Sequence, residues 1–109
     1  MATVSRSELL NLHQELSHTA RQLMKKKNHD YSGGEDETHP FLNFTRCESM
    51  GICTTEQGFL VRLTDKMSRL STFCSSGRLK VEDEKLEDTI LDVINYAILF
   101  YAYNSGLKD

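Results

Sequence analysis

The sequence predicts an all-α fold, in which three long helices and one short helix form a single compact bundle over residues 1–109. Three observations lead to this fold class. Apolar residues recur at steps of three and four in three long segments, as they do on the buried face of a helix. No segment alternates between apolar and polar residues as a half-buried strand would. A chain of 109 residues holds one modest core, so we expect oligomerisation to complete it.

The first long helix is predicted over residues 6–27. Ser5 and Glu8 have the spacing of a capping box, in which two side chains satisfy backbone N–H groups at the helix start. The apolar residues that follow share one face: Leu9, Leu12, Leu16, Ala20 and Leu23. Three lysines at 25–27 end the helix, where positive charge suits the helix dipole. Residues 28–40 contain paired glycines and the only proline, so they are predicted to be a loop.

A short helix or turn is predicted over residues 41–50, followed by a long helix over 55–75. Residues 80–83 are predicted to lead into the third long helix, which ends after Asn104. Thr54 and Gln57 form a second capping-box pattern at the start of the second long helix. The apolar stripe of that helix consists of Leu60, Leu63, Met67, Leu70 and Cys74. The third long helix is apolar nearly all round, which predicts a central and largely buried element.

Charge and cysteine usage exclude several classes of protein. The 13 basic and 16 acidic residues give a net charge of −3, so direct binding to nucleic-acid polymers is not expected. Cys47, Cys53 and Cys74 form no C-x-x-C pair and are interpreted as ordinary thiols of a reducing compartment. The most apolar run is short and is interrupted by Asp92 and Asn95, which argues against a membrane span. We therefore expect a soluble, cytoplasmic protein with no membrane partner.

Three polar residues interrupt the apolar third helix on one face: Asp88, Asp92 and Asn95. An ionised carboxylate in such surroundings needs a cation, hydrogen bonds or a metal ion beside it. One interpretation pairs Asp92 with Arg62 or Arg69, while the asparagine bonds a neighbouring backbone group. The other has these oxygens hold one or two Mg²⁺ ions together with Asp65, since hard cations prefer oxygen ligands.

Basic residues gather around one acid on the second long helix, opposite its apolar stripe: Arg62, Asp65, Lys66 and Arg69. The pattern is typical either of a solvated face with local ion pairs or of a site whose cations neutralise phosphate oxygens. A second polar segment comprises Lys27, His29, Asp30 and Tyr31. It would add phosphate and base contacts at the rim, or be only a basic last turn and a loop. Phe41 and Phe44 suit a core better than a base-stacking platform.

Four blocks of the sequence, in this order, resemble a known family: KKNHDY at 26–31, FLNF at 41–44, VRLTDKMSRL at 61–70 and EDTILDVINYAI at 87–98. They look like the nucleotide modification associated domain 1 proteins of phages and bacteria, a group related to the MazG-like nucleoside triphosphate pyrophosphatases. The resemblance covers residues 25–102. It implies a MazG-like all-α bundle that pairs subunits through a four-helix core, and Mg²⁺-dependent cleavage of a nucleotide between its α and β phosphates.

Two acids are carried over from the family by position. Asp92 matches the last acid of an E-x-x-D motif, and Asp65 matches the last acid of an E-E-x-x-E motif. The sequence departs from both motifs, because Val61 and Arg62 stand where the first two glutamates belong, and Thr89 stands at the first acid of E-x-x-D. Fewer carboxylates remain for a metal, and an arginine replaces a metal ligand with a phosphate ligand.

Two functions follow as hypotheses, beside the option of a purely structural helical oligomer. The first is a Mg²⁺-dependent pyrophosphohydrolase that converts nucleoside or deoxynucleoside triphosphates to a monophosphate and pyrophosphate, in phage-type nucleotide metabolism or modification within a host cytoplasm. Asp65 and Asp92 would be catalytic and would hold the metal together with Asp88. The substrate would contact Lys27, His29, Asp30, Tyr31, Arg62, Lys66, Arg69 and Asn95. The second is a nucleotide-binding sponge or sensor that does not hydrolyse its ligand. A homodimer or homotetramer is expected for both.

Overall fold

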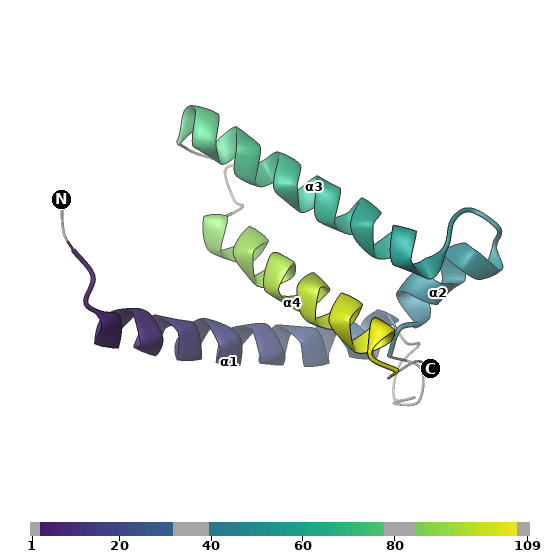
Figure 1. Cartoon of the computed structure of the whole chain (residues 1–109), viewed down its shortest axis with the longest axis horizontal. Coiled ribbons are helices and arrows are strands. Elements are labelled where there is room, and N and C mark those ends of the chain that lie inside the picture. The colour runs from purple at the N-terminus through teal and green to yellow at the C-terminus, as the bar shows by residue number, and fades with distance from the viewer. Residues whose placement is uncertain (1–2, 32–39, 78–84, 107–109) are drawn as a thin grey trace.

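The computed structural model describes residues 3–31, 40–77 and 85–106. Within these ranges the chain forms helices and no strand (Figure 1), which confirms the all-α prediction. The helices are α1 Arg6–Tyr31, α2 Leu42–Ser49, α3 Thr55–Ser76 and α4 Leu86–Asn104. The boundaries of α2 and α3 agree with the prediction to within a residue or two, and α4 ends where predicted. None of these helices is long and apolar enough to cross a membrane, judged over the same ranges.

Helix α1 differs from the prediction at its C-terminal end. It continues to Tyr31, four residues past the predicted end, through positions predicted to be a loop. The remainder of that predicted loop, residues 32–39, lies outside the described residues. Because of the extra turn, the helix carries Asn28 within its last turns, where the Asn28 side chain donates a hydrogen bond to the carbonyl oxygen of Pro40 at 2.6 Å. This bond ties the end of α1 to the segment that begins α2.

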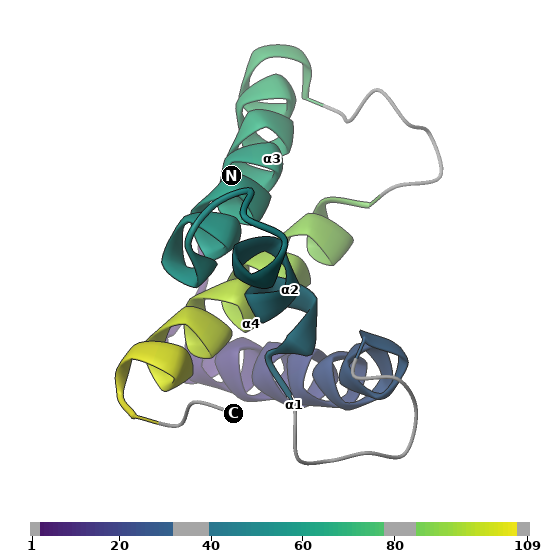
Figure 2. The ribbon, with the colours of Figure 1, turned by 90° about the vertical axis from the view of Figure 1, so that its right-hand side faces the viewer.

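Helix α4 occupies the centre of the molecule. It packs against α3 on one side and against α1 on the other, while α2 packs against the start of α3 (Figure 2). The central position of α4 agrees with its nearly continuous apolar sequence, because a helix that contacts neighbours on two sides needs apolar residues over most of its circumference. Residues from all three long helices can therefore meet only along α4.

The core is small and aromatic. Phe41, Phe44, Phe59 and Tyr96 form its buried cluster, in which the rings of Phe44 and Phe59 stack with centroids 4.0 Å apart. Phe59 is fully buried. The prediction that Phe41 and Phe44 fill the core is confirmed. Such a cluster joins α2, α3 and α4, and aromatic side chains contribute more buried area per residue than any others.

The helix ends agree with the sequence signals. Thr54 and Gln57 form the predicted capping box, with the Gln57 N–H donating to Thr54 Oγ1 at 3.1 Å and the Thr54 N–H to Gln57 Oε1 at 3.0 Å. At the start of α1, the Glu8 N–H donates to the Ser5 hydroxyl at 3.1 Å. Gly77 ends α3 with a φ of 74°, a left-handed conformation that glycine adopts without strain.

The single chain is less compact than predicted. Its radius of gyration is 15.9 Å, whereas a compact domain of this length has about 13 Å. Its accessible surface is 8188 Å², against about 6,200 Å² for a compact monomer of the same mass. Several residues predicted to lie in the core are largely exposed: Leu9, Leu12, Leu60 and Met67. The physical reason is that α1 and α3 each contact the bundle through only part of their apolar face.

Candidate functional site

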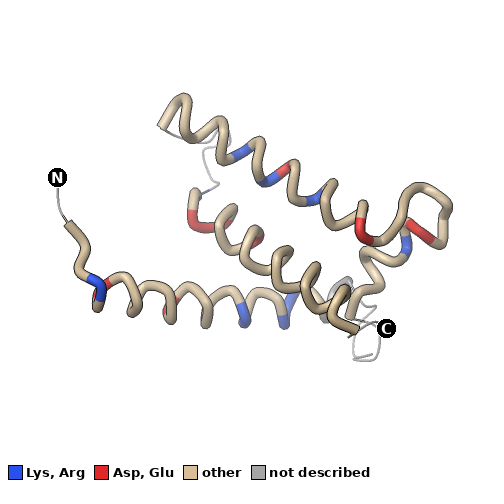
Figure 3. Tube along the Cα trace, in the orientation of Figure 1, with Lys and Arg blue, Asp and Glu red and all other residues tan. Residues whose placement is uncertain are grey.

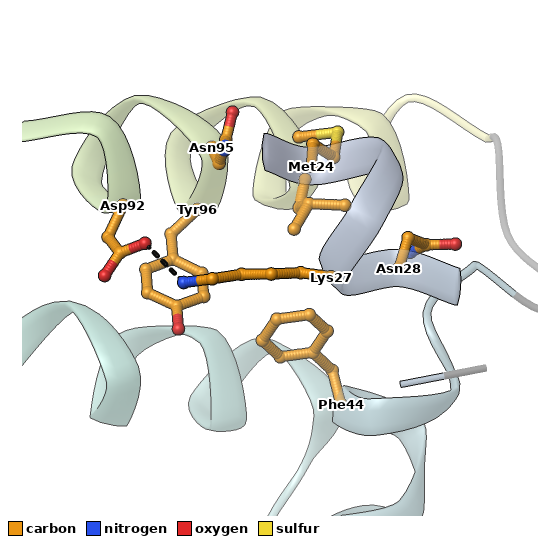
Figure 4. A pocket seen from close by; sticks show the side chains of 8 residues that line it. Met24, Lys27, Asn28, Phe44, Asp92, Asn95 and Tyr96 are labelled. Atoms are coloured by element: carbon orange, nitrogen blue, oxygen red, sulfur yellow. Dashed lines mark hydrogen bonds and ion pairs between the residues drawn. The ribbon is translucent and has the colours of Figure 1, made fainter. Parts of the chain in front are cut away.

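The Asp92 carboxylate of α4 lies between two lysines from different helices. Its Oδ1 is 2.9 Å from Nζ of Lys27 on α1 (Figure 4), and its Oδ2 is 3.0 Å from Nζ of Lys66 on α3. The side chains of Asp92 and Lys66 are only 15% and 12% exposed. This arrangement agrees with the interpretation that pairs Asp92 with a cation, one of the two that the sequence left open. The partners named for it, Arg62 and Arg69, are wrong.

The choice of partners follows from how α3 is rotated. The helix directs Lys66 toward α4, although the sequence placed Lys66 on a solvent-facing side. Arg69 lies almost one turn further on and instead pairs with Asp65 at 3.5 Å. Figure 3 shows the basic residues of α3 and of the later part of α1 on the two helices that flank α4. The two lysines therefore reach one carboxylate from opposite sides.

Two opposing effects determine the pKa of Asp92. Burial raises it, because a charged carboxylate loses solvation. Hydrogen bonds from Lys27 and Lys66 and their positive charges lower it, and the net result is a pKa below the ordinary value of 3.8. Asp92 is therefore ionised at neutral pH.

The other two acids of the predicted metal site lie apart from this arrangement. Asp65 is exposed, with Oδ2 at 3.9 Å from Nζ of Lys66. Asp88 is also exposed, and its Oδ2 accepts a hydrogen bond from the Lys85 N–H at 3.4 Å, at the start of α4. Over the described ranges, no three His, Cys, Asp or Glu side chains are grouped so that they could hold a metal ion. The predicted Mg²⁺ ligands do not form a ready site in the single chain.

Asn95 fastens α4 to α1. Its Nδ2 donates a hydrogen bond to the backbone carbonyl of Ala20 at 2.9 Å, which confirms the predicted bond to a neighbouring backbone group. Asn95 is 6% exposed, and its Oδ1 accepts no hydrogen bond from the residues that the structure describes. A buried amide oxygen without a donor costs free energy, so the hydrogen bond to Ala20 is made at the expense of an unsatisfied acceptor.

A small pocket opens beside the ion pair. Its volume is about 30 Å³, enough for about one water molecule. Eight residues from α1, α2 and α4 line it (Figure 4): Met24, Lys27, Asn28, Phe44, Asp92, Asn95, Tyr96 and Leu99. Of these residues, only Lys27, Asp92 and Asn95 were predicted from the sequence to belong to a site. Most of the other lining residues are apolar, and helical periodicity places them on the core-facing sides of their helices. Periodicity does not show whether a core-facing residue also lines a pocket.

Arg62 stands at the edge of the same region. Its guanidinium lies over the ring of Phe44, 5.8 Å from the ring centroid, and the side chain is half-buried. Among the residues of the described ranges, no carboxylate forms an ion pair with it. A guanidinium that rests on a ring face keeps all its N–H donors for an anion.

The remaining predicted residues divide into two groups. Helix α1 includes His29, Asp30 and Tyr31, but their side chains lie outside the described residues. At the positions where the family has acids, Val61 is exposed and Thr89 is fully buried, and no residue of the described ranges bonds the Thr89 hydroxyl.

The network predicts a specific effect of Asp92→Asn. The amide keeps the shape but leaves Lys27 and Lys66 without their anion, so the free energy of unfolding at pH 7 should fall by about 1–3 kcal/mol. Because the folded-state pKa of Asp92 is lowered, its stabilising effect is present above the unfolded pKa and is lost as the pH falls through the folded one. The variant should therefore approach the wild type below about pH 4.

Chemical denaturation at pH 7 and between pH 4 and pH 2 measures both effects. Asp65→Asn is the matched control, since it makes the same chemical change at an exposed residue of the same network. The control should leave stability nearly unchanged. Equal losses in the two variants would show that Asp92 has no special structural role.

Comparison with known proteins assigns no family. No family model matches the sequence, and neither the curated proteins nor the solved structures include a significant match. The resemblance to the nucleotide modification associated domain 1 proteins therefore rests on the four sequence blocks alone. What it implies about activity, metal and assembly enters below as a proposal.

Proposed function

We propose that this protein binds a nucleotide, a nucleoside or deoxynucleoside triphosphate or a close relative, through its phosphate groups at the surface where α1 and α3 flank α4. The observation that carries this proposal is a set of three basic side chains from two helices. Lys27 of α1 lines the pocket, and Lys66 and Arg62 of α3 contact residues that line it, Asp92 and Phe44. Lys66 retains ammonium donors beyond those directed at Asp92. Arg62 adds a guanidinium that lies over the Phe44 ring and forms no ion pair with a carboxylate of the described residues.

The ion pair also accounts for the acid in the apolar helix. Asp92 would be costly to bury alone, and the resemblance to a metal enzyme offers one reason for keeping it there. The two lysines offer another, because Asp92 holds their charged ends in place beside the pocket. A phosphate-binding protein thus gains a fixed pair of cations from Asp92, which supports binding without hydrolysis. A sponge or sensor of a nucleotide signal is the role that this would suit.

A Mg²⁺-dependent pyrophosphohydrolase is the second candidate, and one observation favours it. Nζ of Lys66 contacts carboxylates of both Asp65 and Asp92, at 3.9 Å and 3.0 Å, so the two acids lie within reach of one cation. A metal bound there would draw on Asp65 and Asp92, with Asp88 one turn earlier. Mg²⁺, when bound, polarises a phosphate and lowers the pKa of a coordinated water. Arg62 and Arg69 would then offset charge on the departing pyrophosphate.

The chain is also proposed to act as a homo-oligomer. Its accessible surface exceeds that of a compact monomer by about 2,000 Å², more than the roughly 800 Å² that each partner of a standard interface buries. Large apolar side chains are exposed on all three long helices, including Leu10, Val61, Ile98 and Tyr101. A second copy that covers these faces would also add walls to a pocket that is now too small for a nucleotide.

Nucleotide binding should depend on Arg62. Calorimetric titration with each common NTP and dNTP, in EDTA and then in Mg²⁺, should detect binding that Arg62→Gln weakens about tenfold or more, since a charge-assisted hydrogen bond is lost. Arg46→Gln removes an exposed arginine from α2 and should bind as the wild type does. Absence of heat with every nucleotide, in either condition, would refute both candidate functions.

Chromatography of the same mixtures distinguishes the two candidates. Intact nucleotide after long incubation with Mg²⁺ supports the binding protein. Release of monophosphate and pyrophosphate that disappears in Asp92→Asn would instead establish the pyrophosphohydrolase. Release that persists in this variant would exclude Asp92 from the chemistry.

The oligomer should depend on the exposed face of α4. Analytical ultracentrifugation of the wild type should give at least twice the mass of one chain, and Ile98→Glu combined with Tyr101→Glu should give a single chain, because buried carboxylates oppose association. Ser71→Glu with Ser75→Glu adds the same charges to exposed polar positions of α3 and should leave the mass unchanged. A wild type that sediments as one chain would contradict the proposal.

A further inference from the structure

Two thiols meet at the corner between α2 and α3. Cys47 belongs to the last turn of α2, and Cys53 lies two residues before the start of α3. Their sulfur atoms are 3.4 Å apart, in hydrogen-bond contact, and both side chains are half-buried. From the sequence they were interpreted as ordinary thiols, because the three cysteines form no C-x-x-C pair.

The backbone of the corner brings them together. The N–H groups of Ile52 and Cys53 both donate to the carbonyl oxygen of Cys47, at 2.9 and 3.4 Å. Gly51 turns the chain with a φ of 75°, which glycine adopts without strain. The Thr55 N–H donates to the Glu48 carboxylate at 2.9 Å. These bonds hold both ends of the turn, so the contact of the two thiols is a consequence of the local fold.

Gly58 makes room for the first sulfur. A Cβ at this position would lie 2.8 Å from Sγ of Cys47, closer than any ordinary contact. The glycine lets the first turn of α3 approach the end of α2, and Sγ of Cys47 lies between that turn and the carbonyl oxygen of Phe44, to which it donates at 2.9 Å. Phe44 also lines the pocket, so the thiol pair is one helical turn from the candidate site.

We propose that Cys47 and Cys53 form a reversible intramolecular disulfide when the chain meets a small-molecule disulfide oxidant. One thiolate attacks the oxidant and forms a mixed disulfide with release of one small thiol; the second protein thiol then displaces the other small thiol. The two protein thiols lose two electrons and two protons, and the oxidant becomes two thiols. The sulfurs need to approach by about 1.4 Å to reach the S–S bond length of about 2.05 Å.

The order of attack follows from the local chemistry. The hydrogen bond to Cys47, together with burial, raises the pKa of the Cys53 thiol. A raised pKa disfavours the thiolate that makes the first attack, so we expect Cys53 to react second. This inference does not depend on the proposed nucleotide binding. It concerns a modification site at the α2–α3 corner, which would make one wall of the pocket responsive to oxidation.

The test uses the full chain carrying Cys74→Ser, which removes the exposed third thiol. The protein is equilibrated with mixtures of oxidised and reduced glutathione, folded and in urea, then alkylated and digested with trypsin. Both cysteines fall in one tryptic peptide, residues 47–62. The peptide should lose two hydrogens, resist alkylation, and recover two alkylatable thiols after dithiothreitol. In the folded protein the disulfide should form at a ratio of oxidised to reduced glutathione at least about tenfold lower than the ratio needed in urea.

Adding Cys53→Ser supplies the matched control. It should stop the reaction at a stable glutathione adduct on Cys47. Equal ratios in the folded and urea-treated protein would overturn the proposal, because they would show that the fold does not bring the thiols together. Glutathione on both cysteines, or disulfides between chains, would also overturn it.

Discussion

The position of Asp92 between two lysines is the constraint on which the rest of the structure depends. Helix α4 is the central helix, and an acid on its buried side would be untenable without cations beside it. Lys27 and Lys66 provide those cations from the two flanking helices. The same ion pairs fix the relative rotation of α1, α3 and α4, keep the Asp92 carboxylate ionised, and hold two ammonium groups at the edge of a pocket. Structure and candidate function thus share one electrostatic arrangement.

The aromatic core of the described residues lies at one end of the bundle. Phe44 and Phe59 join α2 and α3 to the C-terminal half of α4, whereas the N-terminal part of α1 extends along the molecule with exposed leucines (Figure 1). Exposed apolar area of this extent is unfavourable in a monomer. A second copy of the chain would cover this apolar surface and would also deepen the pocket. The same interface would thus compensate for the small core and make room for a ligand as large as a nucleotide.

Much of the fold could be predicted from the sequence, and less of the site. Periodicity and capping residues located the helices, because both are local signals. The extension of α1 through Asn28 was missed, since its stabilising bond to Pro40 joins residues 12 positions apart in the sequence. Periodicity also identified Asp92 and Asn95 as exceptional, but not Lys27 and Lys66 as the partners. Partner choice depends on how three helices are rotated against one another, which spacing along one helix does not determine. The contact of Cys47 and Cys53 was missed for a similar reason. It depends on the geometry of the turn between α2 and α3, which the spacing of the two cysteines in the sequence does not determine.

The pKa of Asp92, measured directly, tests the central claim. Carbon-detected NMR of the side-chain carboxyl groups can follow each acid through an acid titration, with Asp92→Asn identifying the signal. If the two lysines hold the carboxylate as described, the Asp92 signal should titrate below the ordinary value of 3.8 and return toward it in a Lys66→Met variant. A midpoint at or above 3.8 in the wild-type protein would contradict the account, because burial would then outweigh the lysines and the ion pair would not organise the site.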